Sequence, residues 1–219
     1  SLICILSEFK FLFIDYNKTV SKLKSGFYSK IGTFRAIPKV HKTDKFGAFK
    51  KALRPIIDMK DTITEAACTI LKEQARKINY GIKLYAGHHD EMDDIRDIIL
   101  GVIKYNENAS NSNPFIIKNM IASDINSLYD NINQNDTNYS YNYAINKLLP
   151  IGYIDDDLIN LWHKASNFLF ENAYFNYNGN IYKIMNSQIQ GTKSGADCCM
   201  MVLNVMECKY KEKSNELLA

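Results

Sequence analysis

The sequence lacks a hydrophobic run long enough to cross a membrane, and it has only 5 cysteines among 219 residues. Its most apolar stretch, residues 1–14, is interrupted by Glu8 and Lys10, which favours a packed amphipathic helix over a signal peptide. The cysteines show no CxxC spacing, and no histidine lies at zinc-ligand spacing from them. We therefore expect an intracellular, reducing compartment, free thiols, no structural metal and no membrane contact.

The composition is that of an ordinary globular protein, with 46% hydrophobic and 23% charged residues, and the chain shows no internal repeat. Its net charge is only +3, but the basic residues are unevenly placed. Between Lys18 and Arg54 the only acid is Asp44, whereas the basic residues are Lys18, Lys22, Lys24, Lys30, Arg35, Lys39, Lys42, Lys45, Lys50, Lys51 and Arg54. This block indicates either a polyanionic partner, such as nucleic acid or nucleotide phosphates, or a solvated basic face.

The first half of the chain predicts helices flanking a hairpin. Residues 2–24 have helical periodicity, and the extended stretches 33–42 and 53–59 are joined by a basic loop that contains glycine. A capping box at Thr62 predicts a helix that ends near Gly81, and a second helix is expected from Asp90 to about Lys104.

The second half predicts a polar stretch at 133–140, a short helix at 141–149 and a longer helix from Asp156. Alternating aromatic and polar residues flank a turn at 178–180, which is typical of a hairpin. A glycine-containing loop then leads into a final helix from about residue 196 to the last residue.

The stretch IIKNMIASDINSLYDNI, residues 116–132, begins as an apolar run suited to a buried strand and places Asp124 where that run ends. A carboxylate there is costly to hold away from water unless it binds a cation, usually a metal. Asp124 could instead cap the helical turn that follows, because Asp is a good N-cap residue. Both interpretations stay open on this stretch alone.

Several motifs occur in order along the chain: PKVHK at 38–42, RPI at 54–56, DINSLYDNI at 124–132, FNYNGNIY at 175–182, QIQGTKSG at 188–195 and NVMEC at 204–208. In this order they resemble the fingers and palm of a reverse transcriptase, and the nearest likeness is to the Penelope-like and telomerase-related branch. The resemblance covers roughly residues 27–210.

The resemblance implies a role for each motif. Asp124 matches the catalytic motif A carboxylate, which would hold Mg²⁺ for two-metal nucleotidyl transfer. Tyr129 matches the steric gate that favours deoxynucleotides. The other implied nucleotide-binding residues are Lys39, Arg54, Gln188 and Gly191. Those implied to contact nucleic acid are Arg35, Lys42, Lys45, Lys50 and Lys51.

The fold that the resemblance implies is α+β, with a palm-type antiparallel sheet backed by helices and a fingers β-hairpin. Residues 1–110 would form the N-terminal helix and fingers region, and residues 111–219 a partial palm with motifs A and B. The sheet is expected to be incomplete at its C-terminal end, so that a protein partner or a further segment would cover its open edge.

The sequence also departs from the family pattern. Motif C, with its paired aspartates, is absent, and we interpret the acids of GYIDDDLINLW, Asp155 and Asp156, as helix-capping and first-turn residues. Ser194 replaces a usual methionine in motif B, and Asp197 places a negative charge close to the expected nucleic-acid path.

Because one carboxylate cannot build a two-metal site, these 219 residues alone are predicted to be inactive. They would belong to an RNA-directed DNA polymerase that acts on RNA or an RNA/DNA hybrid and on dNTPs, with motif C located elsewhere. Alternatively, they form an inactive RNA-binding scaffold of a ribonucleoprotein such as an organellar ribosome. Nucleus and mitochondrion both remain open as locations.

Overall fold

The computed structural model describes residues 16–26, 30–38, 53–83, 92–108, 117, 125, 128–185 and 187–218. The chain divides into two compact units, one built from residues 1–86 and 127–219 and the other from residues 87–126. The described part of the second unit contains helix α4 (Met92–Glu107), whose Asn106 side chain exchanges hydrogen bonds with the backbone of Ile117 at 2.9 and 3.0 Å.

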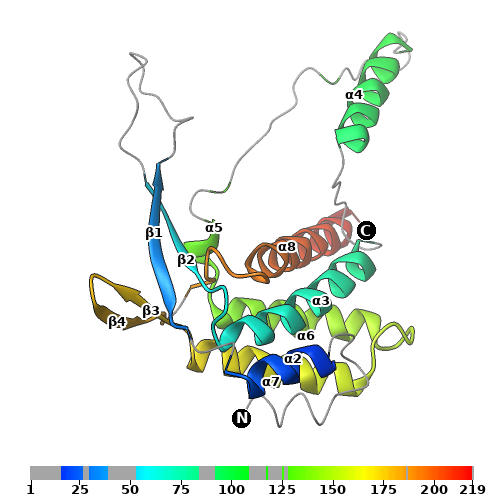
Figure 1. Ribbon diagram of the computed structural model, residues 1–219. Helices are drawn as coiled ribbons and strands as arrows, with labels where there is room; N and C mark the ends of the chain where they lie inside the picture. The colour runs from blue at the N-terminus through cyan, green and yellow to red at the C-terminus, as the bar shows by residue number, and fades with distance from the viewer. Residues whose placement is uncertain are drawn as a thin grey trace, which may run out of the picture. The chain divides into compact units, whose positions relative to one another are not determined.

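The first unit contains the remaining helices and all the strands of the described residues (Figure 1). Its helices are α2 (Tyr16–Lys24), α3 (Thr64–Ile82), α5 (Leu128–Asn131), α6 (Gln134–Leu148), α7 (Asp156–Glu171) and α8 (Gly195–Leu218). Its strands are β1 (Gly32–Pro38), β2 (Leu53–Asp58), β3 (Tyr174–Tyr177) and β4 (Asn180–Lys183). The described fold is therefore α+β, with seven helices and one open sheet of four strands, as expected at the level of fold class.

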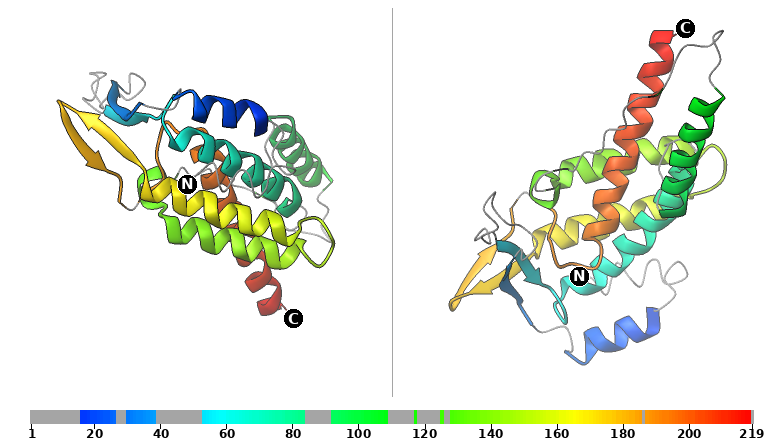
Figure 2. Two further views of the ribbon diagram at one scale, coloured as in Figure 1. Left: turned by 60° about the horizontal axis from the view of Figure 1, so that its bottom comes forward. Right: turned by 90° about the horizontal axis from the view of Figure 1, so that it is seen from above.

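Helices α3, α6, α7 and α8 pack into a bundle around the main hydrophobic core, as the two views of Figure 2 show. The apolar faces of these helices supply the buried residues, and Trp162 of α7 stacks on Tyr141 of α6 with ring centroids 4.2 Å apart. The Tyr141 hydroxyl donates to Gln74 of α3 at 3.1 Å. A buried ring pair with a satisfied hydroxyl thus joins α3, α6 and α7.

The sheet lies at one end of this bundle and has the strand order β2-β1-β3-β4 (Figure 1). Both predicted hairpins are confirmed as antiparallel pairs, and they are joined by a short parallel pairing of β1 with β3, so the sheet is mixed. Asn178 and Gly179 make the β3–β4 turn with φ of 51° and 82°, the conformation that a two-residue hairpin turn requires.

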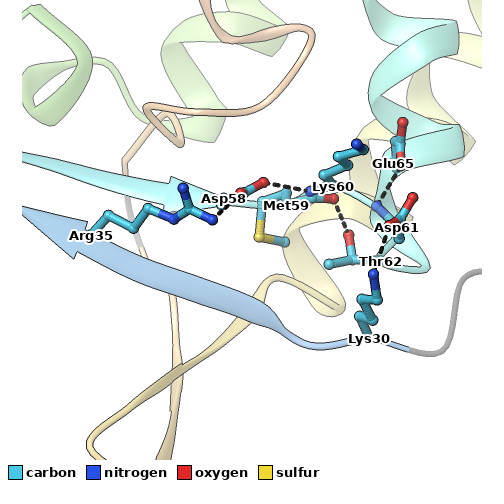
Figure 3. Close-up of polar contacts among 8 residues, drawn as sticks. All are labelled: Lys30, Arg35, Asp58, Met59, Lys60, Asp61, Thr62 and Glu65. Carbon is cyan, nitrogen blue, oxygen red and sulfur yellow. Dashed lines mark hydrogen bonds and ion pairs between the residues drawn. The ribbon is translucent and has the colours of Figure 1, made fainter.

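Two helix starts differ from the sequence expectation. Helix α6 begins at Gln134 rather than 141, because Asn133 and Asp136 form a capping box and the polar stretch continues as helix. The capping box expected at Thr62 does not form: Thr62 donates to the carbonyl of Met59 at 2.7 Å, and Glu65 accepts from the amide of Asp61 at 2.6 Å (Figure 3).

The expected start of α7 is confirmed. Asp155 is the N-cap of α7 and accepts a hydrogen bond from the Leu158 amide at 2.9 Å. Cys68, Cys198, Cys199 and Cys208 are free and buried, which is consistent with a reducing compartment. Within the described ranges, no helix has the length and hydropathy of a membrane span. The predicted strand that precedes Asp124 lies largely outside the described residues, and the division near residue 110 stays a prediction.

Candidate nucleotide-binding site

The loop between β4 and α8 is tied down at its start by Gln188. The Gln188 amide donates to the carbonyl of Ile132 at 2.7 Å, and its side-chain Nε2 donates to Thr137 Oγ1 at 2.7 Å. The residue is only 4% exposed. Its side-chain amide therefore anchors the loop to the start of α6, where the capping box has brought Thr137 into the first helical turn.

The middle of the same loop lies directly against strand β2. The amide of Ile57, on the outer edge of β2, donates to the carbonyl of Gln190 at 2.8 Å. Gly191 has a φ of +113°, and a Cβ added there would lie 2.4 Å from the carbonyl oxygen of Ile57. This position therefore requires glycine for two reasons: the positive φ, and the close approach of the loop backbone to the backbone of β2. The loop thereby covers the edge of β2.

Tyr129 lies at the end of this loop, against the start of α8. A Cβ added at Gly195 would lie 3.1 Å from Cε1 of Tyr129, so the absence of a side chain there makes room for the ring. The half-buried Tyr129 also packs against the small cluster of Ile132, Cys199 and Val202. Three segments that are distant in sequence, β2, α5 and the loop before α8, therefore meet at one place.

The electrostatics connect Tyr129 with residues of two other elements. Burial raises the pKa of the Tyr129 hydroxyl, the charges of Cys199 and Asp197 raise it further, and the charge of Arg54 opposes them. Arg54 is exposed on β2, opposite Ile37 of β1. None of the described residues forms an ion pair with its guanidinium. Its guanidinium has the planar donor geometry that suits bidentate contacts with an anion, at the edge of the Tyr129 environment.

Arg35 differs from Arg54 in this respect. Its guanidinium pairs with Asp58 across the β1–β2 hairpin at 3.0 Å (Figure 3). Arg35 was predicted to contact nucleic acid. The ion pair with Asp58 uses some of the N–H donors of its guanidinium, and the side chain is still 62% exposed. That prediction stays open.

The two departures from the motif B pattern lie at the end of the loop and in the first turn of α8. Ser194 is fully buried at the end of the loop. Asp197, in the first turn of α8, accepts a hydrogen bond from Arg76 Nε of α3 at 3.0 Å. Within the loop, Lys193 pairs with Glu65 of α3 at 2.5 Å, and a cavity of about 210 Å³ lies against Gly191, Thr192 and Lys193.

The predicted metal ligand and the predicted lysines are not among these residues. Asp124, Lys39, Lys42, Lys45, Lys50 and Lys51 lie outside the described residues. In the part of the chain that is described, no three His, Cys, Asp or Glu side chains converge as a metal site would require.

Sequence reasoning did not identify Arg76, Asn79 or Thr137, and it placed Asn204 in the NVMEC motif without giving it a role. Arg76 and Asp197 are 121 residues apart in the chain, and no local pattern signals such a pair. Only the Asn133–Asp136 spacing, which is that of a capping box, could have indicated that Thr137 belongs to a first helical turn.

Comparisons with known proteins found no relative of this chain. No protein-family model matches the chain, and neither a curated protein nor a solved structure matches it.

Proposed function

We propose that the chain is the fingers and partial palm of a reverse-transcriptase-like protein, and that Arg54, Tyr129 and the loop 188–195 bound its nucleotide pocket. The observation that carries this proposal is the meeting of β2, α5 and the loop before α8. These are the segments to which the motif resemblance assigns nucleotide contacts, although they lie far apart in the sequence.

The chemistry of the described residues suits a deoxynucleoside triphosphate. The Arg54 guanidinium, which no described residue pairs with, can form bidentate contacts with phosphate oxygens. The Tyr129 ring lies between Gly195 and its apolar cluster, and in this proposal its edge excludes a ribose 2′-hydroxyl. In this proposal, β1 and β2 form the fingers hairpin, and α5, α6 and α8 belong to the palm region. The palm-type antiparallel sheet remains part of the proposal.

Catalysis requires groups beyond the described residues. Asp124 would hold Mg²⁺ together with carboxylates from outside these 219 residues, and the metal would activate the primer hydroxyl and neutralise the triphosphate. The proposed substrates are an RNA or RNA/DNA template and dNTPs, in a nuclear or mitochondrial setting. All four residues of the edge strand β4 are exposed, which supports a protein partner or a further segment at that edge.

Primer extension on an RNA template tests this proposal, using the full product of the gene with whatever coding sequence follows Ala219. We expect synthesis of DNA that Asp124→Ala abolishes. The matched control is Asp155→Ala, which removes an acid of the superficially similar GYIDDD motif and should leave synthesis intact at a temperature where the protein is folded. Synthesis retained in Asp124→Ala would refute the assignment.

The alternative function is an RNA-binding scaffold without polymerase activity, which the lysine-rich segment between β1 and β2 supports. It predicts no extension, together with salt-sensitive RNA binding that Asp124→Ala leaves unchanged. Extension by the wild-type protein would exclude it as the sole function.

A further inference from the structure

Asp197 is an acid in an unfavourable place for the function proposed above. It lies in the first turn of α8, two positions after Gly195, where an added Cβ would lie 3.1 Å from the Tyr129 ring. A carboxylate is favourable at a helix N-terminus, because the helix dipole is positive there. The same charge would repel a triphosphate bound beside Tyr129, because like charges repel appreciably where solvent screening is incomplete.

Helix α3 supplies contacts that hold this carboxylate. Arg76 Nε donates to Asp197 Oδ1 at 3.0 Å, and Asn79, on the next turn of α3, donates to the backbone carbonyl of Asp197 at 2.9 Å. Asn79 is in turn bound by Asn204 Nδ2 at 3.0 Å, from two turns further along α8. Asn79 and Asn204 are buried, whereas the Arg76 side chain is 64% exposed.

The asparagine hydrogen bonds and the Arg76–Asp197 ion pair have different effects. The buried asparagines fix the position of α8 along α3 through uncharged hydrogen bonds. The Arg76–Asp197 pair is exposed on its arginine side and adds little to folding stability, since ion pairs in contact with solvent typically contribute about 0–1 kcal/mol. What the pair does provide is a positive charge on the α3 side of Asp197.

We propose that Arg76 is a positioning residue that keeps the Asp197 carboxylate bound to α3 and neutralised, so that the neighbouring pocket accepts a triphosphate. This role rests on the proposed function, because it concerns the same pocket. Arg76 acts through Asp197 and does not itself touch the nucleotide.

The first test follows the Tyr129 hydroxyl, which is sensitive to charge whether or not a nucleotide binds. The groups that act on it are Arg54 from β2 and Asp197 and Cys199 from α8. We expect Arg76→Ala to raise the Tyr129 pKa further, because Asp197 is then uncompensated, and Arg76→Ala with Asp197→Asn to return it toward the wild-type value. The measurement is a ¹³C NMR titration of tyrosine Cζ, with Tyr129→Phe identifying the resonance.

The second test measures equilibrium binding of dATP in the presence of Mg²⁺ and an RNA–DNA primer-template with a dideoxy-terminated primer. Arg76→Ala should weaken dATP binding about fivefold at low ionic strength, and the effect should shrink at high salt. Adding Asp197→Asn should restore binding. Lys30→Ala is the matched control, because Lys30 forms a similarly exposed ion pair with Asp61 at 2.8 Å and lies beside the start of α3 rather than at the pocket (Figure 3).

The two readouts separate the two proposals. If the wild-type protein does not bind dATP, the proposed function fails, and the Tyr129 titration still decides whether Arg76 neutralises Asp197. If the wild-type protein binds dATP but Arg76→Ala binds it equally well at low salt, the role of Arg76 is refuted. An unchanged Tyr129 pKa in Arg76→Ala would also refute it.

Discussion

Replacing Gly191 by alanine tests the contact between the loop and β2. The added Cβ would lie 2.4 Å from the Ile57 carbonyl oxygen and 2.8 Å from Ile56 Cγ2, so the loop would have to move away from the strand. Movement would break the 2.8 Å hydrogen bond from the Ile57 amide to Gln190, and alanine at a φ of +113° would be strained in any case.

The magnitude follows from these two effects. Backbone strain at a positive φ costs about 1–3 kcal/mol, and breaking a hydrogen bond costs about 1 kcal/mol. We therefore expect Gly191→Ala to lower the free energy of unfolding by roughly 3 kcal/mol, equivalent to a fall in Tm of roughly 6–12 °C for a chain of this size. Urea unfolding followed by circular dichroism measures the change.

Gly152→Ala is the matched control. Gly152 also has a positive φ, of 69°, but a Cβ added there would meet nothing within 4 Å. This variant should be destabilised by only about 1 kcal/mol, through strain. If both variants were destabilised equally, the close approach of the loop to β2 would be refuted, and with it the structural link between the loop and Arg54.

Three further predictions concern other parts of the molecule. Asp155→Ala should cost about 1 kcal/mol of stability because it removes the N-cap of α7, and Asp155→Asn, which keeps the acceptor, should cost less in the same urea assay. Burial raises the pKa of the Cys68 and Cys199 thiols from 9.0 to about 12. As the pH rises, both thiols therefore lose their protons at a lower pH in the unfolded chain than in the folded protein. Their contribution to stability is therefore complete below pH 9 and should decline between pH 9 and 12, and a double substitution to alanine should flatten that part of the stability–pH curve. Reversing the charges of Lys39, Lys42 and Arg54 should weaken RNA binding and reduce its dependence on salt, with the logarithmic slope falling by roughly one for each phosphate that is no longer neutralised. An unchanged slope would count against this RNA interface.

Much of the local structure could be predicted because its signals are local. The Asn-Gly turn between two stretches of alternating aromatic and polar residues indicated the β3–β4 hairpin. The aspartates that precede a stretch of helical periodicity indicated the start of α7. The start of α6 was missed because a polar composition was interpreted as a loop, although the structure buries Thr137, Ser140 and Tyr141 of that helix. At α3, Glu65 binds the amide of Asp61, one residue earlier than a capping box requires.

The assembly of the site could be predicted only in part. The motif resemblance named Arg54, Tyr129 and Gly191 together, but the reason that the loop needs Gly191 is its approach to β2, which depends on tertiary packing. The parallel pairing of β1 with β3 and the Arg76–Asp197 pair join segments more than a hundred residues apart. A sequence pattern describes one element at a time, and such contacts arise only when the elements pack.

The central claim is that Tyr129 and Arg54 bound a pocket for a deoxynucleoside triphosphate. Competition between dATP and ATP for the wild-type protein and for Tyr129→Ala, on the same terminated primer-template, tests it most directly. We predict a preference for dATP in the wild-type protein that falls by at least about tenfold in Tyr129→Ala, since a side chain that excludes the 2′-hydroxyl has been removed. Equal binding of the two nucleotides by the wild-type protein, or a preference that survives the removal of the ring, would contradict it.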